Sequence, residues 1–134
     1  MSGIGSVMDL LQSSLEASNL RQQVYADNIA NADTPGYQAK DVAFESLLNQ
    51  SLNPAPVPTL QMGQGHVALG LQPSLNTVQP VIEQTGPSTV QNNGNNVDIE
   101  TQMANLAENQ IRYNALSQDI MMRYSRMKEV LTGM

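Results

Sequence analysis

The side chains that could carry out chemistry in this chain are few and scattered. Its single histidine, His66, lies in the segment GQGHVALG with no carboxylate nearby. A catalytic acid, base or nucleophile works only where a second group converges on it, and no serine lies in a recognisable motif with a base. The sequence also lacks a phosphate-binding loop, a dinucleotide-binding glycine motif, a paired-histidine zinc motif and a calcium-binding loop. We therefore expect no enzyme, and no cofactor or metal site.

The composition excludes further classes of site. Disulfides and thiolate metal ligands are excluded because there is no cysteine. The net charge is −6 and the six Lys and Arg residues are spread over both ends, so no basic stripe is available for nucleic acid. No run approaches the roughly 20 apolar residues that span a membrane, and the first residues lack the pattern of a cleaved signal peptide. We predict no nucleic-acid partner and no direct transmembrane segment.

The most distinctive local chemistry lies between residues 27 and 45, DNIANADTPGYQAKDVAFE. Asn28 and Asn31 are three apart on one face of a predicted helix, where their amides can bind backbone carbonyls or a neighbouring subunit. Pro35 and Gly36 suit the two central positions of a type II turn, which would redirect the chain. An ordinary helix end followed by a favourable turn explains the same residues without a neighbour.

The spacing of apolar residues predicts helices that must position this stretch. Residues 4–15 follow the i, i+3, i+4, i+7 pattern, which then drifts. We expect one long helix, or two joined near residues 17–19, ending about Ala32. A short helix is predicted from Asp41, as its N-cap, through Leu52.

The clearest periodicity is in the last part of the chain, where an apolar residue recurs every seven positions. Asp98 or Asn96 is suited to cap the start of this helix, and Gly133 to end it. A helix of about 35 residues is about 50 Å long, so its apolar face needs a long partner. Packing on the N-terminal helix, with or without continuation between subunits, would cover it. The repeat consists of Ile99, Leu106, Tyr113, Ile120, Met127 and Met134.

The middle of the chain has a different composition. Between residues 46 and 97 the only charged residue is Glu83, and six of the seven prolines fall there. Apolar residues alternate at Val67, Leu69 and Leu71, which permits at most one short hairpin. We interpret this stretch as an extended connector.

We therefore predict a mainly α protein whose long N- and C-terminal helices pair as an antiparallel coiled coil, with an extended Pro/Gln/Asn-rich middle segment. Residues 1–52 and 96–134 would form one discontinuous helical domain, and residues 53–95 the connector.

The acidic residues of the N-terminal helix are open to two interpretations. Asp9, Glu16 and Asp27 are balanced there only by Arg21. They form either a solvated polar face or a docking face for a basic neighbour.

Two stretches of the chain resemble one known family. The run Asn28-Ile29-Ala30-Asn31 followed by Thr34-Pro35-Gly36-Tyr37 resembles the N-terminal signature of bacterial flagellar rod and hook proteins, over about residues 20–44. Residues 95–116 look like the C-terminal helix of that family. Within them, LAENQ and the following Arg112-Tyr113 are most similar to the membrane-proximal rod protein. The short middle segment fits as well, since distal relatives carry large insertions there.

The resemblance implies a structural subunit of the flagellar basal-body proximal rod, polymerising into the axial shaft that transmits torque across the periplasm. It implies type III export without a cleaved signal peptide. The implied partners are other flagellar rod subunits, the rod–ring junction protein, the inner-membrane ring and the export gate, in a homo- and hetero-oligomeric helical assembly. The expected subunit-interface residues are Asn28, Ile29, Asn31, Thr34, Pro35, Gly36, Tyr37, Leu106, Asn109, Arg112, Tyr113, Ile120 and Met127.

Two other classes of function make different demands on the chain. A non-polymerising, soluble coiled-coil regulator or export-linked binding protein would be a stable monomer or small oligomer that does not reside in the basal body. A wall-cleaving enzyme would require catalytic residues, which the sequence does not supply.

Overall fold

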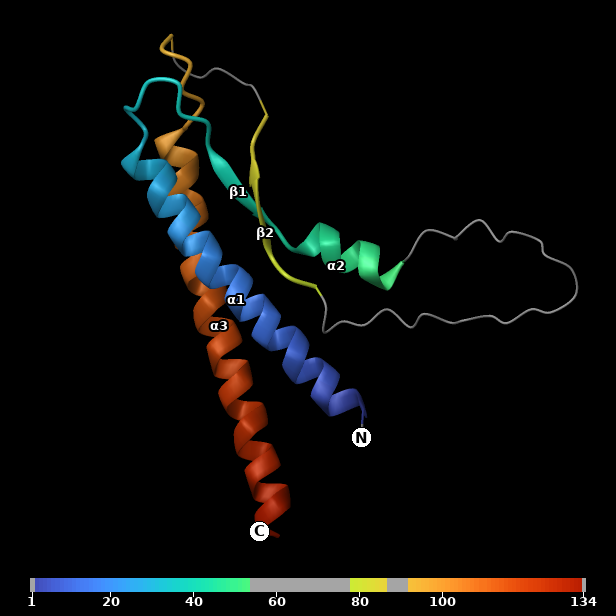
Figure 1. The fold of residues 1–134 in the computed structure, drawn as a ribbon. Helices are drawn as coiled ribbons and strands as arrows, with labels where there is room; N and C mark the ends of the chain where they lie inside the picture. Colours follow the sequence, from blue (N-terminus) through green and yellow to red (C-terminus); the bar gives the residue numbers. More distant parts are fainter. Residues whose placement is uncertain (1, 54–77, 87–91, 134) are drawn as a thin grey trace, which may run out of the picture.

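The computed structural model describes residues 2–53, 78–86 and 92–133 (Figure 1). It is mainly helical, and its two long helices pack together and run in opposite directions, so that both chain ends lie at the same end of the molecule. The elements in chain order are α1 (Ser2–Ala30), β1 (Lys40–Ala43), α2 (Glu45–Leu52), β2 (Val81–Gln84) and α3 (Ile99–Thr132).

The N-terminal pattern gives one uninterrupted helix, α1, which ends at Ala30. The predicted turn follows: the Tyr37 amide donates to the Thr34 carbonyl at 3.2 Å, and Gly36 has a φ of 73°. A positive φ at the third position is what a type II turn requires. The Gly36 amide also donates to the Asn93 carbonyl at 3.0 Å, which ties the turn to the segment before α3.

The prediction of Asp41 as a helix N-cap is wrong. Asp41 lies inside β1, and α2 begins at Glu45 after Phe44, which makes no side-chain cap hydrogen bond. The Asp41 carboxylate instead accepts from the Val42 amide at 2.7 Å. Pairing of residues 40–43 with a distant strand therefore overrides the local capping preference.

The strand pairing joins distant parts of the chain. β1 and β2 form an antiparallel pair in which Lys40 lies opposite Gln84 and Ala43 opposite Val81. β2 falls in the stretch predicted to be a connector, but its partner precedes α2, so the two strands are not a local hairpin. His66 and the alternating residues at 67–71 lie outside the described residues.

The apolar core is divided into three small clusters along α1 and its neighbours. Among the partly buried apolar residues of the described part of the chain that pack against these clusters, Leu106 is the one from α3. The buried members are Ala17, Phe44 and Val78 in the first, Val24, Tyr25 and Val42 in the second, and Ala32, Ala39 and Val97 in the third.

Both predicted ends of α3 are confirmed. The Asp98 carboxylate accepts from the Glu100 and Thr101 amides at the N-cap, and Gly133 has a φ of 69° at the C-cap. The Asp98 side chain at one end and the left-handed backbone of Gly133 at the other are sufficient to fix these boundaries.

The heptad positions of α3 are only partly covered. Leu106, Ile120 and Met127 are half-buried, whereas Ile99 is 42% exposed and Tyr113 36% exposed. The last position, Met134, lies outside the described residues. The predicted seam exists, but one α1 helix does not cover all of it.

Gly36→Val is expected to lower the free energy of unfolding by at least about 1 kcal/mol, because a β-branched residue is strained at positive φ. A Cβ at Gly36 meets no atom within 4 Å, so the loss would come from the backbone alone. Urea unfolding of the purified chain measures it. Gly86→Val is the matched control, since Gly86 has equal space and no positive φ. Equal urea midpoints for Gly36→Val and Gly86→Val would contradict the claim that the positive φ of Gly36 causes the loss.

Candidate functional site

The candidate site is the junction where the end of α1 meets β1 and the start of α3. Its central residue is Asn28, whose side chain is fully buried. The Asn28 amide nitrogen donates to the Lys40 carbonyl at 2.7 Å and to the Gln102 side-chain oxygen at 2.9 Å. Its oxygen accepts from the Lys40 amide at 2.9 Å and the Tyr37 hydroxyl at 3.2 Å. One side chain thus holds two helices, a strand and the turn.

Asn95 fixes the end of α1 from the other side. It is fully buried, and its amide nitrogen donates to the carbonyls of Asn31 and Thr34, both at 2.8 Å. The Asn31 carbonyl also accepts from the Thr34 amide at 3.0 Å and the Thr34 carbonyl from the Tyr37 amide at 3.2 Å, so Asn95 gives each carbonyl of the turn a second hydrogen bond. Its oxygen accepts from the Val97 amide at 2.7 Å, which positions the chain entering α3.

Asn96 ties the same segment to the sheet. Its side-chain oxygen accepts from the Ala39 amide at 2.6 Å, and its nitrogen lies 3.3 Å from the Gly86 carbonyl. Ala39 immediately precedes β1, and Gly86 follows β2. Consecutive asparagines therefore anchor the start of α3 to the turn and to the sheet.

A second set of buried hydrogen bonds joins the middles of the long helices. Asn109 is the one buried residue of α3, and its oxygen accepts from the Ser18 hydroxyl at 2.9 Å. Its nitrogen donates to the Ser18 carbonyl at 2.8 Å and lies 3.3 Å from the Gln22 side-chain oxygen. A buried polar pair in a helix seam favours one register, because any slip leaves its groups unpaired.

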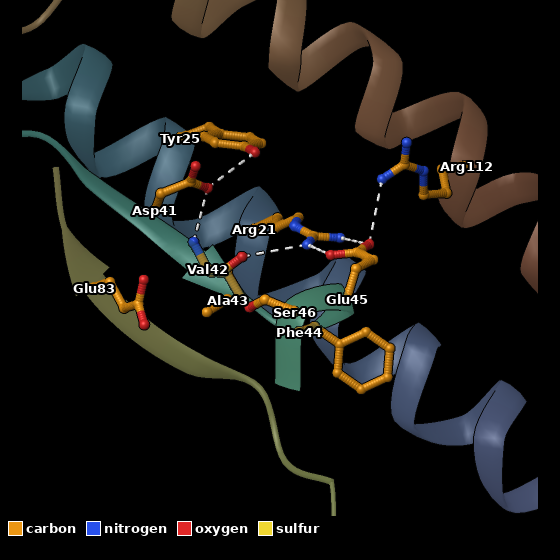
Figure 2. A pocket seen from close by; sticks show the side chains of 10 residues that line it. All are labelled: Arg21, Tyr25, Asp41, Val42, Ala43, Phe44, Glu45, Ser46, Glu83 and Arg112. Atoms are coloured by element: carbon orange, nitrogen blue, oxygen red, sulfur yellow. Dashed lines mark hydrogen bonds and ion pairs between the residues drawn. The ribbon is translucent and has the colours of Figure 1, made fainter. Parts of the chain in front are cut away.

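An ion-pair cluster lines an open pocket beside these hydrogen bonds (Figure 2). The Arg21 guanidinium of α1 donates to both carboxylate oxygens of Glu45 at the start of α2, and to the Val42 carbonyl at 3.2 Å. Arg112 of α3 reaches the same Glu45 carboxylate at 3.7 Å. The cluster therefore joins all three helices.

The cluster keeps its groups ionised. The hydrogen bond from Arg21 lowers the pKa of the Glu45 carboxyl, and the same bond raises the pKa of Arg21. Burial raises the pKa of Tyr25, whose hydroxyl donates to Asp41 at 3.3 Å. Arg21 and Glu45 stay charged and bind each other, an arrangement suited to holding elements together and not to proton transfer.

Nothing in the described ranges suggests metal binding or membrane insertion. Within residues 2–53, 78–86 and 92–133, no three His, Cys, Asp or Glu side chains are grouped to hold a metal ion. In those same ranges no helix is both long and apolar enough to cross a bilayer. The arrangement is a mechanical junction that sets how α1 and α3 diverge.

The predicted interface residues separate into two groups. Some serve the fold: Asn28 and Asn109 are buried, and Ile29, Asn31, Tyr37, Leu106, Ile120 and Met127 are half-buried. Others are available to a neighbour, since Thr34, Pro35, Gly36, Arg112 and Tyr113 are exposed. The junction brings the N-terminal members together around the turn, whereas Ile120 and Met127 belong to the second half of α3. Their role between subunits stays a prediction.

Several residues of the junction were not predicted from sequence. No local signal pairs Arg21 with Glu45 or Ser18 with Asn109, because each pair is distant in sequence. The asparagines at 95 and 96 did carry a signal, since the family resemblance of the C-terminal helix begins at Asn95.

Comparison with known proteins agrees with that resemblance. A family model described as "Flagella basal body rod protein" matches residues 8–38, which include most of α1 and the turn. The chain is 35% identical to the flagellar basal body rod protein FlgB of Bacillus subtilis strain 168, over 99% of this chain and 98% of the relative. It is also 35% identical to FlgB of Borrelia hermsii, over 79% of this chain and 81% of that protein. FlgB of Salmonella typhimurium strain LT2 is 35% identical, over 73% of this chain and 75% of its own length.

Asn28→Asp is expected to destabilise the isolated chain by about 2–4 kcal/mol. The change buries a charge, and it replaces the amide nitrogen that donates to the Lys40 carbonyl with a carboxylate oxygen that can only accept. The matched control is Asn31→Asp, just after the same helix. The Asn31 side chain makes only short-range bonds, donating to the Asp27 carbonyl and accepting from the Thr34 hydroxyl. Thermal and urea unfolding compare the two. A loss in the control as large as that in Asn28→Asp would refute the central position given to Asn28.

The Arg21–Glu45 pair predicts a pH-dependent contribution to stability. The folded pKa of Glu45 is lowered, so its contribution is present above the ordinary value of 4.5 and is lost as pH falls through the lower folded pKa. The wild-type chain should therefore have a higher Tm than Glu45→Gln at pH 7, and the gap should close below about pH 4. The gap is expected to be small because the Glu45 side chain is 58% exposed. Glu16→Gln is the surface control, since Glu16 is exposed and joins none of the ion pairs of the described residues. A pH-independent gap would count against the pair.

Proposed function

The chain belongs to the flagellar basal body rod protein family, and from this premise we propose that it is a structural subunit of the proximal rod. In this proposal copies polymerise into the axial shaft that transmits torque across the periplasm. The chain is exported without a cleaved signal peptide and has no catalytic role. Its partners are other rod subunits, the rod–ring junction protein, the inner-membrane ring and the export gate.

One observation supports assembly most strongly: an apolar stripe along the end of α3 is largely uncovered. Tyr124 is 64% exposed and Leu131 84%, and their spacing of seven places them on one face of the helix with the half-buried Ile120 and Met127. In Figure 1 this end extends away from α1, which packs against the other half of α3. A long apolar stripe left in water by a single chain marks a surface for other protein.

The junction supports the same proposal. Its buried amide bonds hold α1 and α3 at one angle, so every copy would present its uncovered helix end in the same orientation. Repeated contacts in a helical polymer require every copy to present the same surface in the same orientation. In the assembly, α1 and α3 continue as an antiparallel coiled coil whose outer positions are covered by neighbours.

Leu131→Asp is expected to leave the Tm of the isolated chain unchanged, because this side chain contacts solvent, and to lower the amount of chain in purified basal bodies at least about tenfold. Quantitative mass spectrometry of basal bodies measures it. Gln118→Asp, which adds the same charge at a polar position of α3, is the control. Normal incorporation of Leu131→Asp would oppose the proposal. A stable wild-type monomer absent from basal bodies would favour the soluble regulator or export-linked binding protein.

A further inference from the structure

The outer face of the two-stranded sheet carries two carboxylates that repel each other. Asp41 and Glu83 lie directly opposite across the β1–β2 pair, and both are exposed. Neither joins any of the ion pairs formed within the described residues. The Asp41 carboxylate accepts from the Tyr25 hydroxyl at 3.3 Å and the Val42 amide at 2.7 Å, but both donors are neutral and leave its charge unbalanced. In Figure 2 the Glu83 carboxylate stands apart from the Arg21–Glu45 pair. Like charges directly opposite destabilise a strand pair, so this arrangement leaves a favourable position for a cation from outside.

Apolar surface lies beside these charges. Val81 is 48% exposed and lies two residues before Glu83, so the two side chains share the outer face of the sheet. The opposite face packs on α1 through Val42, which is buried. The outer face of the sheet, defined by Asp41, Val81 and Glu83, is thus acidic and partly apolar.

The end of α3 carries the complementary pattern. Met122, Arg126 and Val130 are spaced four apart and form one ridge along the helix. Met122 is 54% exposed and Val130 80% exposed. Arg126 is exposed and joins none of the ion pairs of the described residues, whereas the neighbouring Arg123 is paired with Asp119. The ridge therefore offers one unpaired cation between two apolar side chains.

The two surfaces are separated within one chain. The sheet packs beside α1, whereas the end of α3 extends past it toward the C-terminus (Figure 1). A contact between the ridge and the outer face of the sheet therefore has to form between two copies.

We propose that the α3 ridge of one copy docks on the outer face of the sheet of a second copy, with Arg126 placed between Asp41 and Glu83. Met122 and Val130 lie one helical turn to either side of Arg126, so one of them then covers the apolar surface at Val81. The occupant is a second copy because its ridge matches the sheet face in both charge and apolar surface. The contact uses different surfaces on the two partners, so it does not close as a two-fold dimer and each copy can pass it on to the next. The inference rests on the proposed assembly and specifies one contact within it.

The test exchanges the two charges in the full-length chain. Glu83→Arg and Arg126→Glu each place like charges at the contact and should weaken self-association at least about tenfold. An equimolar mixture of these two variants should associate again, because each contact then joins opposite charges. The double variant, Glu83→Arg with Arg126→Glu, should associate alone. Sedimentation velocity over a range of concentration and salt measures all four samples.

Two controls separate loss of this contact from unfolding and from a change in net charge. Glu83→Arg places a cation opposite Asp41, so the Tm of the isolated variant should not fall, and lost association cannot be ascribed to unfolding. Glu16→Arg, and the double variant Gln12→Glu with Gln23→Glu, make the same changes in net charge at exposed positions of α1 outside the two surfaces. Each should associate as the wild type does.

The results separate this contact from the rod proposal. Weak association of both single variants with recovery in the mixture supports the contact. Wild-type association by either single variant, no recovery in the mixture, or no self-association of the wild-type chain would overturn it. Absence of the wild-type chain from basal bodies would instead overturn the proposed function, whatever sedimentation shows.

Discussion

The hydrogen-bonding capacity of one buried amide constrains the rest of this structure. Asn28 lies on α1 with no exposed surface, and its donors and acceptor are all used by groups on β1, the turn and α3. A buried amide left without partners is costly, so moving any of these elements carries a penalty. The turn at Gly36 follows from this constraint, because the chain must reverse at once to bring Tyr37 and Lys40 back to Asn28.

Large apolar side chains are scarce, so this fold depends on buried hydrogen bonds and ion pairs to fix how its elements pack. Aromatic residues make up 4% of the chain, and the buried clusters consist largely of alanine and valine. Such clusters bury little surface and fit together in several ways. Directional bonds, from the asparagines of the junction and from Arg21 to Glu45, select one arrangement. Among the described residues, the same shortage leaves the end of α3 largely exposed.

Local chemistry was sufficient to predict much of the fold. Asp98 and Gly133 set the ends of α3 through their own side-chain and backbone preferences, and Pro35 with Gly36 set the turn. The strand at residues 40–43 could not be predicted, because its partner lies far along the chain and Asp41 reads locally as a helix cap. The same limit applies to the Ser18–Asn109 pair, because 91 residues separate the partners in sequence and only the packed structure brings them together. The contacts that the sequence did not predict join residues far apart in the chain, and their chemistry is ordinary.

Cryo-electron microscopy of purified basal bodies tests the central claim most directly, namely that the junction orients an uncovered helix end for assembly. The account predicts density for this chain in the proximal rod, with α1 and α3 joined through Asn28 and the end of α3 buried against other subunits. Density in which residues 121–132 remain in solvent, or a rod that lacks the chain, would contradict it.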